Sequence, residues 1–176
     1  MKNTRKLIIA AMLCALAVVF KIFVSFDFAP TVRASITPIP VMMCGIIFGP
    51  IFGGICGVIT DILGYVVKPT GSYFPGLTLT MALYGVIPGL FFLKKPINKT
   101  LKFVLAGVAT AITQLFCSFF LNTFWFSDIK GTPFMVEFAQ RVLSSSIHLG
   151  VYTVLIVVLY GVYINFIEPR LYQNKL

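Results

Sequence analysis

The sequence predicts an all-α integral membrane protein, a bundle of six transmembrane helices with both termini in the cytoplasm. Hydrophobic residues make up 59% of the 176 residues and charged residues only 11%, against about 45–50% and about 25% in soluble domains. A soluble domain of this size could not bury so much apolar surface. The composition therefore excludes a soluble enzyme, a disordered chain and a nucleic-acid-binding module. We expect a single transmembrane domain over residues 1–176.

Apolar stretches of membrane-spanning length divide the chain. A spanning helix needs about 20 residues, so six spans would use roughly 120 residues and leave room for short loops. Helices are the default in lipid because they satisfy their backbone polar groups internally. The six spans are expected at about residues 7–26, 39–48, 51–67, 76–93, 101–126 and 134–167.

Each stretch has local support in the sequence. The first follows a basic N-terminus but no small-residue cleavage site follows it, so we interpret it as a retained helix rather than a signal peptide. The second is short, and only Gly49-Pro50 separates it from the third, so one broken span, giving five in all, is the alternative. A segment rich in turn residues, 71–78, precedes the fourth. The fifth and sixth are long, which indicates tilt or extension beyond the bilayer.

The distribution of the 14 Lys and Arg residues supports this map. With the N-terminus in the cytoplasm, nine of them lie on the cytoplasmic side, as the positive-inside rule requires. Three lie outside, namely Arg33, Lys68 and Lys130, and Lys21 and Arg141 fall within spans. A five-span map would place the C-terminal cations outside, so the count favours six. The outer loops are rich in Pro, Gly, Thr, Ser and aromatic residues.

Two ionisable residues, Asp61 and Arg141, lie inside predicted spans near their outer ends. Such groups are costly in a bilayer and usually face a bundle interior, a cavity or each other. They are therefore either a buried structural ion pair or part of the wall of a ligand cavity that opens outward. Arg141 shares a helical stripe with Glu137, Ser145 and His148, which is typical of a pocket wall.

Aromatic residues near the outer ends of the spans offer stacking surfaces. Trp125, three residues after Asn122, is either an anchor at the membrane interface or a platform for an aromatic ligand. The segment 71–78 combines two glycines and a proline with the adjacent Tyr73 and Phe74, which suits a lid over a flat ligand. The four cysteines fit small buried hydrophobes, and no ATP-binding, protease or metal-site motif occurs.

Four stretches of the chain, 31–40, 48–54, 60–64 and 71–79, resemble a known family. They are similar to the substrate-binding S components of the energy-coupling factor (ECF) vitamin transporters, and most of all to the folate-specific branch. With the hydropathy pattern, the resemblance covers about residues 5–165. It implies a six-helix bundle in the bacterial cytoplasmic membrane. The vitamin would bind near the outer face, under the loops that join the first and second, third and fourth, and fifth and sixth helices.

The resemblance also implies partners. A transmembrane coupling subunit and two cytoplasmic ATPase subunits would work with this chain, which would be neither an enzyme nor a holder of a cofactor or metal. The small residues Ala11 and Ala15 of the first helix resemble the family's contact with the coupling subunit. The S component would topple in the membrane to carry its ligand inward.

Folate has a flat pterin ring, an aminobenzoate and a glutamate tail with two carboxylates. The ring would use stacking surfaces and polar groups, and the carboxylates would use cations, which arginine binds through two parallel hydrogen bonds. The alternatives are an S component for pantothenate, riboflavin or thiamin, an intramembrane enzyme using Asp61, Glu137 or His148, and a small channel. The residues expected to bind the vitamin are Phe26, Arg33, Asp61, Tyr65, Lys68, Tyr73, Phe74, Pro75, Gly76, Thr78, Asn122, Trp125, Arg141 and Ser145.

Overall fold

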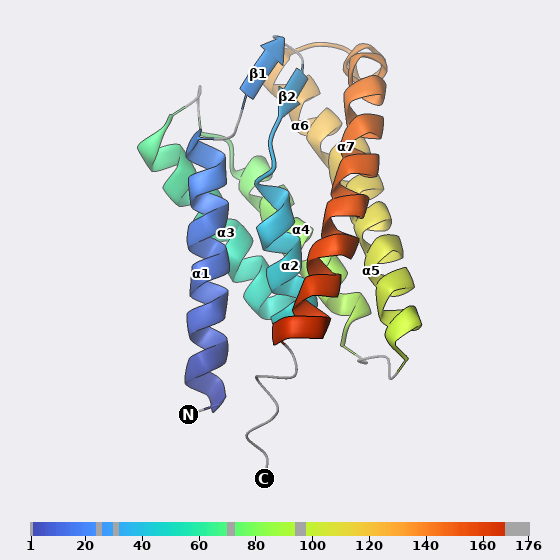
Figure 1. Cartoon of the computed structure of the whole chain (residues 1–176). Helices are drawn as coiled ribbons and strands as arrows, with labels where there is room; N and C mark the ends of the chain where they lie inside the picture. The colour runs from blue at the N-terminus through green and yellow to red at the C-terminus, as the bar shows by residue number, and fades with distance from the viewer. Residues whose placement is uncertain (1, 24–25, 30–31, 70–72, 94–97, 168–176) are drawn as a thin grey trace.

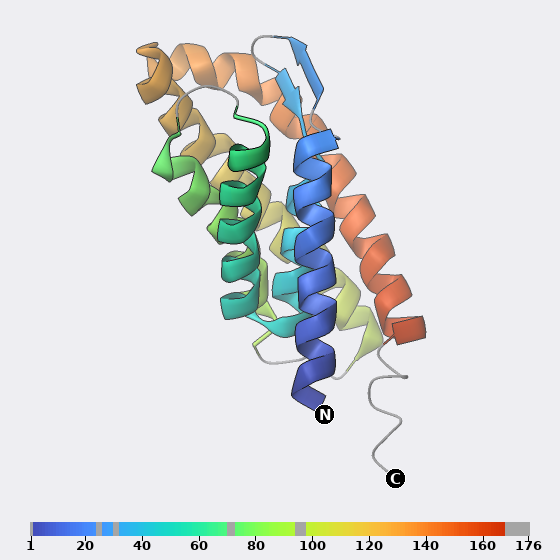
Figure 2. The same ribbon diagram turned by 90° about the vertical axis from the view of Figure 1, so that its left-hand side faces the viewer.

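A computed structural model describes residues 2–23, 26–29, 32–69, 73–93 and 98–167 of the chain. Over these ranges the protein is a bundle of helices that carries one short β-hairpin at one end (Figure 1). The start of α1 and the end of η2 lie together at the opposite end (Figures 1 and 2). The elements are α1 (Lys2–Phe23), β1 (Phe26–Ala29), β2 (Val32–Ala34), α2 (Pro38–Phe48), α3 (Pro50–Val67), α4 (Pro75–Phe91), α5 (Lys99–Gln114), η1 (Leu115–Leu121), α6 (Asn122–Lys130), α7 (Phe134–Val162) and η2 (Tyr163–Ile167).

Proline and glycine set the helix boundaries. The helices α2, α3 and α4 each begin with proline in the first turn, where its missing N–H costs nothing. Gly49 ends α2 and precedes α3 with φ +100°, a left-handed backbone conformation that favours glycine. Gly131, at φ +63°, ends α6 in the same way. The sharp turn at Gly49-Pro50 therefore separates two helices rather than interrupting one.

Four helical stretches are long and apolar enough to cross a membrane within the described ranges. They are Lys6–Phe23, Pro50–Val67, Thr100–Lys130 and Ser145–Asn165. The helices α2 and α4 are apolar but shorter. Each predicted stretch thus carries helix, while the number of spans and the cytoplasmic placement of both ends stay predictions.

The short helix α2 lies in the middle of the bundle (Figure 1). Its residues from Pro38 to Ile46 are all buried, and it packs against α1, α3, α4 and α7. A helix that is hydrophobic on every side is stable only when other elements surround it. This explains how a segment of only 11 residues can be as apolar as a membrane span.

The helices α2, α3 and α4 pack closely through glycines. A Cβ atom on Gly85 of α4 would lie 2.1 Å from the carbonyl oxygen of Gly53 of α3, and one on Gly45 of α2 would lie 2.0 Å from the carbonyl oxygen of Gly85. The recurrence of glycine at four-residue spacing predicts such contacts. These three helices therefore approach one another through their backbones.

The sequence did not predict the β-hairpin. The strands β1 and β2 pair antiparallel, with Phe26 opposite Ala34, where the sequence predicted the end of the first span at Phe26 and then an outer loop. The helix α1 ends earlier, at Phe23. Strands of four and three residues are too short for an alternating pattern to reveal. The end of the bundle that carries this hairpin is called the hairpin end below.

Candidate functional site

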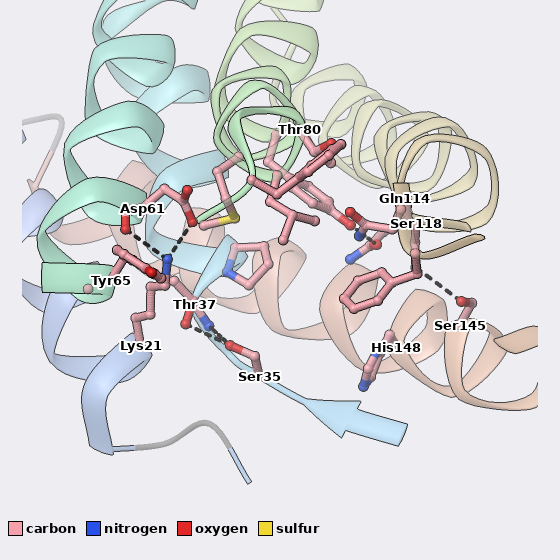
Figure 3. Close-up of a pocket in the computed structure, with 18 of the residues that line it drawn as sticks. Lys21, Ser35, Thr37, Asp61, Tyr65, Thr80, Gln114, Ser118, Ser145 and His148 are labelled. Atoms are coloured by element: carbon pink, nitrogen blue, oxygen red, sulfur yellow. Dashed lines mark hydrogen bonds and ion pairs between the residues drawn. The ribbon is translucent and has the colours of Figure 1, made fainter. Parts of the chain in front are cut away.

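A cavity of about 270 Å³ lies toward the hairpin end of the bundle. Its wall comes from α1, the segment before α2, α3 and Lys68 after it, Tyr73 and Phe74 with α4, the run from α5 to α6, and α7. Small-molecule sites in proteins are concave and mix apolar walls with a few placed polar groups. This cavity combines aromatic, neutral polar and charged side chains, and Figure 3 shows them gathered at its two ends.

The first end holds an ion pair between Lys21 of α1 and Asp61 of α3 (Figure 3). The Lys21 ammonium donates to the Asp61 carboxylate and, at 3.0 Å, to the Asp61 backbone oxygen. Thr78 of α4 donates to the other carboxylate oxygen at 2.6 Å, and the hydroxyls of Thr78 and Tyr73 are 2.8 Å apart. Asp61 is only 7% exposed, and groups from two other helices, α1 and α4, bond its carboxylate.

A glycine makes room for this pair. A Cβ atom on Gly64 would lie 2.3 Å from Cδ of Lys21, which crosses α3 at this point. The Lys21 stem can therefore lie on the backbone of α3. From there it reaches Asp61, which lies one turn before Gly64 on α3. Sequence reasoning missed Lys21 as a site residue, although a lysine inside a predicted span was a signal for it.

The pairing of the buried charges differs from the simplest expectation. Asp61 pairs with Lys21, while Arg141 of α7 pairs with Glu137, one turn earlier, at 3.6 Å. Glu137 is 2% exposed and also accepts from Lys130 at 2.9 Å. The structure thus gives Asp61 and Arg141 different partners.

Of the four residues in the polar stripe predicted on the last helix, all but Glu137 line the cavity. Arg141, Ser145 and His148 line it, as does Tyr152 further along α7. The Arg141 guanidinium also lies over the ring of Phe126, 4.0 Å from its centroid, and this cation–π contact fixes it above α6. A cation held in this way can still offer hydrogen bonds to an anionic group in the cavity.

Aromatic residues near the end of α3 and just before α4 close one side of the cavity. Tyr65 and Tyr73 both line the cavity, with ring centroids 5.2 Å apart. Phe74 lines it too and packs on Trp125, 5.4 Å away. The Trp125 indole donates to Thr80 at 3.2 Å. Trp125 is thus a support behind Phe74, a role that neither sequence interpretation of it included.

The second end of the cavity is neutral and polar (Figure 3). Tyr84 of α4 donates its hydroxyl hydrogen to Oε1 of Gln114 at 3.3 Å. The hydroxyls of Ser118 and Ser145 are 3.0 Å apart and link η1 to α7. Sequence reasoning missed Tyr84, Gln114 and Ser118, because isolated neutral polar residues in apolar helices carry no motif.

A π-helical segment shapes this wall. Gln114 ends α5, and η1 follows it over Leu115–Leu121. Ser118 lies within η1, and Asn122 begins α6. Wider π turns inside α-helices occur most often at functional sites. The segment η1 belongs to a helical run that contributes three cavity residues at a spacing of four, namely Gln114, Ser118 and Asn122.

The structure places the predicted site residues in three groups. Eight line the cavity: Asp61, Tyr65, Lys68, Tyr73, Phe74, Asn122, Arg141 and Ser145. Four lie beside it without lining it: Pro75, Gly76, Thr78 and Trp125. The side chains of Phe26 and Arg33 lie outside the described part of the structure. Of the predicted partner contacts, Ala11 and Ala15 are exposed on α1.

Comparison with known proteins agrees with this geometry. The sequence model of the family described as "ECF transporter, substrate-specific component" matches residues 5–167. The folate transporter FolT of Clostridium novyi (strain NT) is 33% identical over 156 residues, which cover 89% of this chain and 88% of that protein. FolT of Streptococcus mutans serotype c (strain ATCC 700610 / UA159) is 34% identical over 100 residues, 56% of this chain and 54% of that protein.

Two solved structures share the fold. The crystal structure of FolT bound with folic acid superimposes with a TM-score of 0.77 at 27% identity, over 90% of this chain and 93% of that one. The S component of a bacterial ECF transporter gives a TM-score of 0.70 at 22% identity, over 94% and 99%. These relatives are transporter components rather than enzymes.

Proposed function

Because the chain belongs to the family of substrate-specific components of ECF transporters, we propose that it binds folate with high affinity as the S component of such a transporter. The proposal rests on one observation above the others. The cavity at the hairpin end combines cations, aromatic rings and neutral hydrogen-bonding groups, which together match the three parts of folate. The resemblance to FolT bound with folic acid supports the same assignment.

The cations of the cavity suit the glutamate tail of the vitamin. Lys21, Lys68 and Arg141 all line the cavity, and each lies close to the hairpin end of its helix. Arginine can bind a carboxylate through two parallel hydrogen bonds. Phe74, Tyr65 and Tyr73 offer ring faces for the flat parts of the ligand.

The chain is multi-pass in the bacterial cytoplasmic membrane in this proposal, with both termini in the cytoplasm and the hairpin end outside. It captures folate at the outer face and delivers it inward together with the coupling subunit and two ATPase subunits, which alone use ATP. The exposed face of α1 around Ala11 and Ala15 is the contact for the coupling subunit. Large apolar side chains also lie on this face, including Ile8 and Met12, which are exposed.

Titration calorimetry on the detergent-purified chain tests the proposal. We expect folic acid to bind below micromolar concentration without ATP, and Arg141→Ala to weaken binding by about 10- to 100-fold, since a charged hydrogen bond contributes about 1.5–3 kcal/mol. Lys6→Ala is the matched control, because Lys6 is exposed near the far end of α1. A folded protein that binds pantothenate, riboflavin or thiamin but not folic acid would assign a different vitamin.

A further inference from the structure

Gln114 is a buried amide that uses only one of its four hydrogen-bonding sites among the residues the structure describes. Its side chain lines the cavity, and the residue is 1% exposed. Oε1 accepts the Tyr84 hydroxyl, while Nε2 has no hydrogen-bond partner among the residues the structure describes. A buried donor without a partner is costly, and native structures rarely retain one without a reason.

Tyr84 sets the orientation of this amide. The two ends of a glutamine amide have nearly the same shape and are told apart by their hydrogen bonds. A tyrosine hydroxyl can accept as well as donate, but turning the amide over would take away the Oε1 acceptor to which the buried Tyr84 hydroxyl donates here. Tyr84 is itself 4% exposed and belongs to α4, which packs closely against α2 and α3. The arrangement therefore holds a donor, Nε2, at the wall of the cavity.

This amide lies across the cavity from Lys21 and deeper in the bundle than Arg141. Figure 3 shows Gln114 and Ser118 across the cavity from Lys21 and Asp61. Gln114 is 16 residues before the end of the continuous helical run Thr100–Lys130, whereas Arg141 is seven residues from the start of α7. Gln114 therefore lies deeper from the hairpin end than Arg141. An ionised tail stays near the cations and water, so the uncharged ring of an elongated ligand faces Gln114.

We propose that Gln114, oriented by its hydrogen bond with Tyr84, gives the site a preference for ligands whose ring has a carbonyl oxygen next to an N–H group. Nε2 donates to the carbonyl, and the free lone pair of Oε1 accepts from the N–H. This inference rests on the proposed function, because the pterin of folic acid presents such an edge at its positions 3 and 4. In the 4-amino analogue of folic acid an amino group replaces the carbonyl oxygen and the neighbouring nitrogen loses its hydrogen. Both hydrogen bonds would then meet the wrong partner.

The test compares the dissociation constants of folic acid and its 4-amino analogue for the full-length chain in detergent. We expect the unmodified protein to prefer folic acid by at least about tenfold, the effect of one or two buried hydrogen bonds. Gln114→Leu should bring the two dissociation constants within about threefold of each other, because a leucine side chain forms no hydrogen bond with either ligand. Gln140→Leu is the matched control, since Gln140 is exposed on α7.

A second variant separates this role from a structural one. Tyr84→Phe keeps the ring and removes only the hydrogen bond to Oε1, which frees the amide to turn over. We expect the preference for folic acid to fall in this variant more than the affinity for folic acid itself. A change in packing alone would weaken both ligands equally and leave their ratio unchanged.

The outcomes distinguish this inference from the function on which it rests. If the unmodified protein binds folic acid but the ratio of affinities is the same in Gln114→Leu as in the control, the role of Gln114 is wrong and the proposed function stands. If the folded, unmodified protein binds neither ligand, both are overturned. A lost preference in Gln114→Leu and Tyr84→Phe, with the control unchanged, supports the assignment.

Discussion

The ion pair between Lys21 and Asp61 provides the sharpest test of the tertiary structure. Lys21→Met keeps most of the volume of the lysine stem but removes the ammonium. The carboxylate then stays buried with the hydrogen bond from Thr78 but without its counter-ion. Leaving one partner of a fully buried pair alone costs about 3–5 kcal/mol. The Lys21 side chain is 26% exposed and that of Asp61 10%, so a smaller loss of about 2–3 kcal/mol is expected.

Thermal unfolding in detergent measures this loss. For a chain of this length each kcal/mol corresponds to about 2–4 °C, so Tm should fall by about 4–12 °C. The protein supplies its own reporter, because Cys44 and Cys117 are fully buried and react with a thiol dye only on unfolding. Lys6→Met, at an exposed position of α1, is the matched control and should change Tm by less than about 2 °C.

A second substitution checks the cause. Adding Asp61→Asn to Lys21→Met removes the stranded charge while leaving an oxygen for Thr78 to donate to. The double variant should recover at least half of the lost Tm, since the two residues are directly coupled. A double variant whose loss equals the sum of the two single losses would refute the ion pair, as would a shift below about 2 °C in Lys21→Met.

Three further substitutions test other parts of the structure. Gly85→Ala should reduce the yield of monodisperse protein in gel filtration, because the new Cβ would lie 2.1 Å from a backbone oxygen of α3. Gly150→Ala is the control and should leave the yield unchanged, because open space surrounds Gly150. Ala11→Trp should abolish folate uptake in cells that carry the coupling subunits while leaving folate binding by the purified chain intact; loss of both would show that this face packs within the bundle. Trp125→Phe removes the hydrogen bond to Thr80 and should lower stability by about 0.5–1.5 kcal/mol in the same unfolding assay, and an unchanged Tm would contradict that contact.

Helix positions followed from the sequence because the signals are local. Apolar runs, proline at helix starts and glycine at helix ends depend on neighbouring residues only. The six predicted stretches therefore carry helix, and the resemblance to the S components is confirmed by the family match over residues 5–167. The stripe of Arg141, Ser145 and His148 was also predictable, since helical spacing alone places these residues on one face.

Which side chains contact each other inside the bundle was not predictable from the sequence, because it depends on which helices pack together. Asp61 had two candidate roles in the sequence, and only the packing of α1 against α3 across Gly64 brings Lys21 to it. Trp125 lies behind Phe74 because α6 meets the α3–α4 connection there. Eight of the predicted residues line the cavity because they lie toward the same end of the bundle, five of them in helices and three between α3 and α4.

By itself the sequence determined that this chain is an apolar helical bundle, which stretches of it form helices, and to which transporter family it belongs. These properties come from hydrophobic burial and backbone geometry, which act along each segment separately. Only the tertiary structure decided that α2 is enclosed, that Lys21 neutralises Asp61, and that Tyr84 orients Gln114 toward the cavity. Each of these is a contact between residues far apart in the chain, and such contacts exist only once the helices have packed.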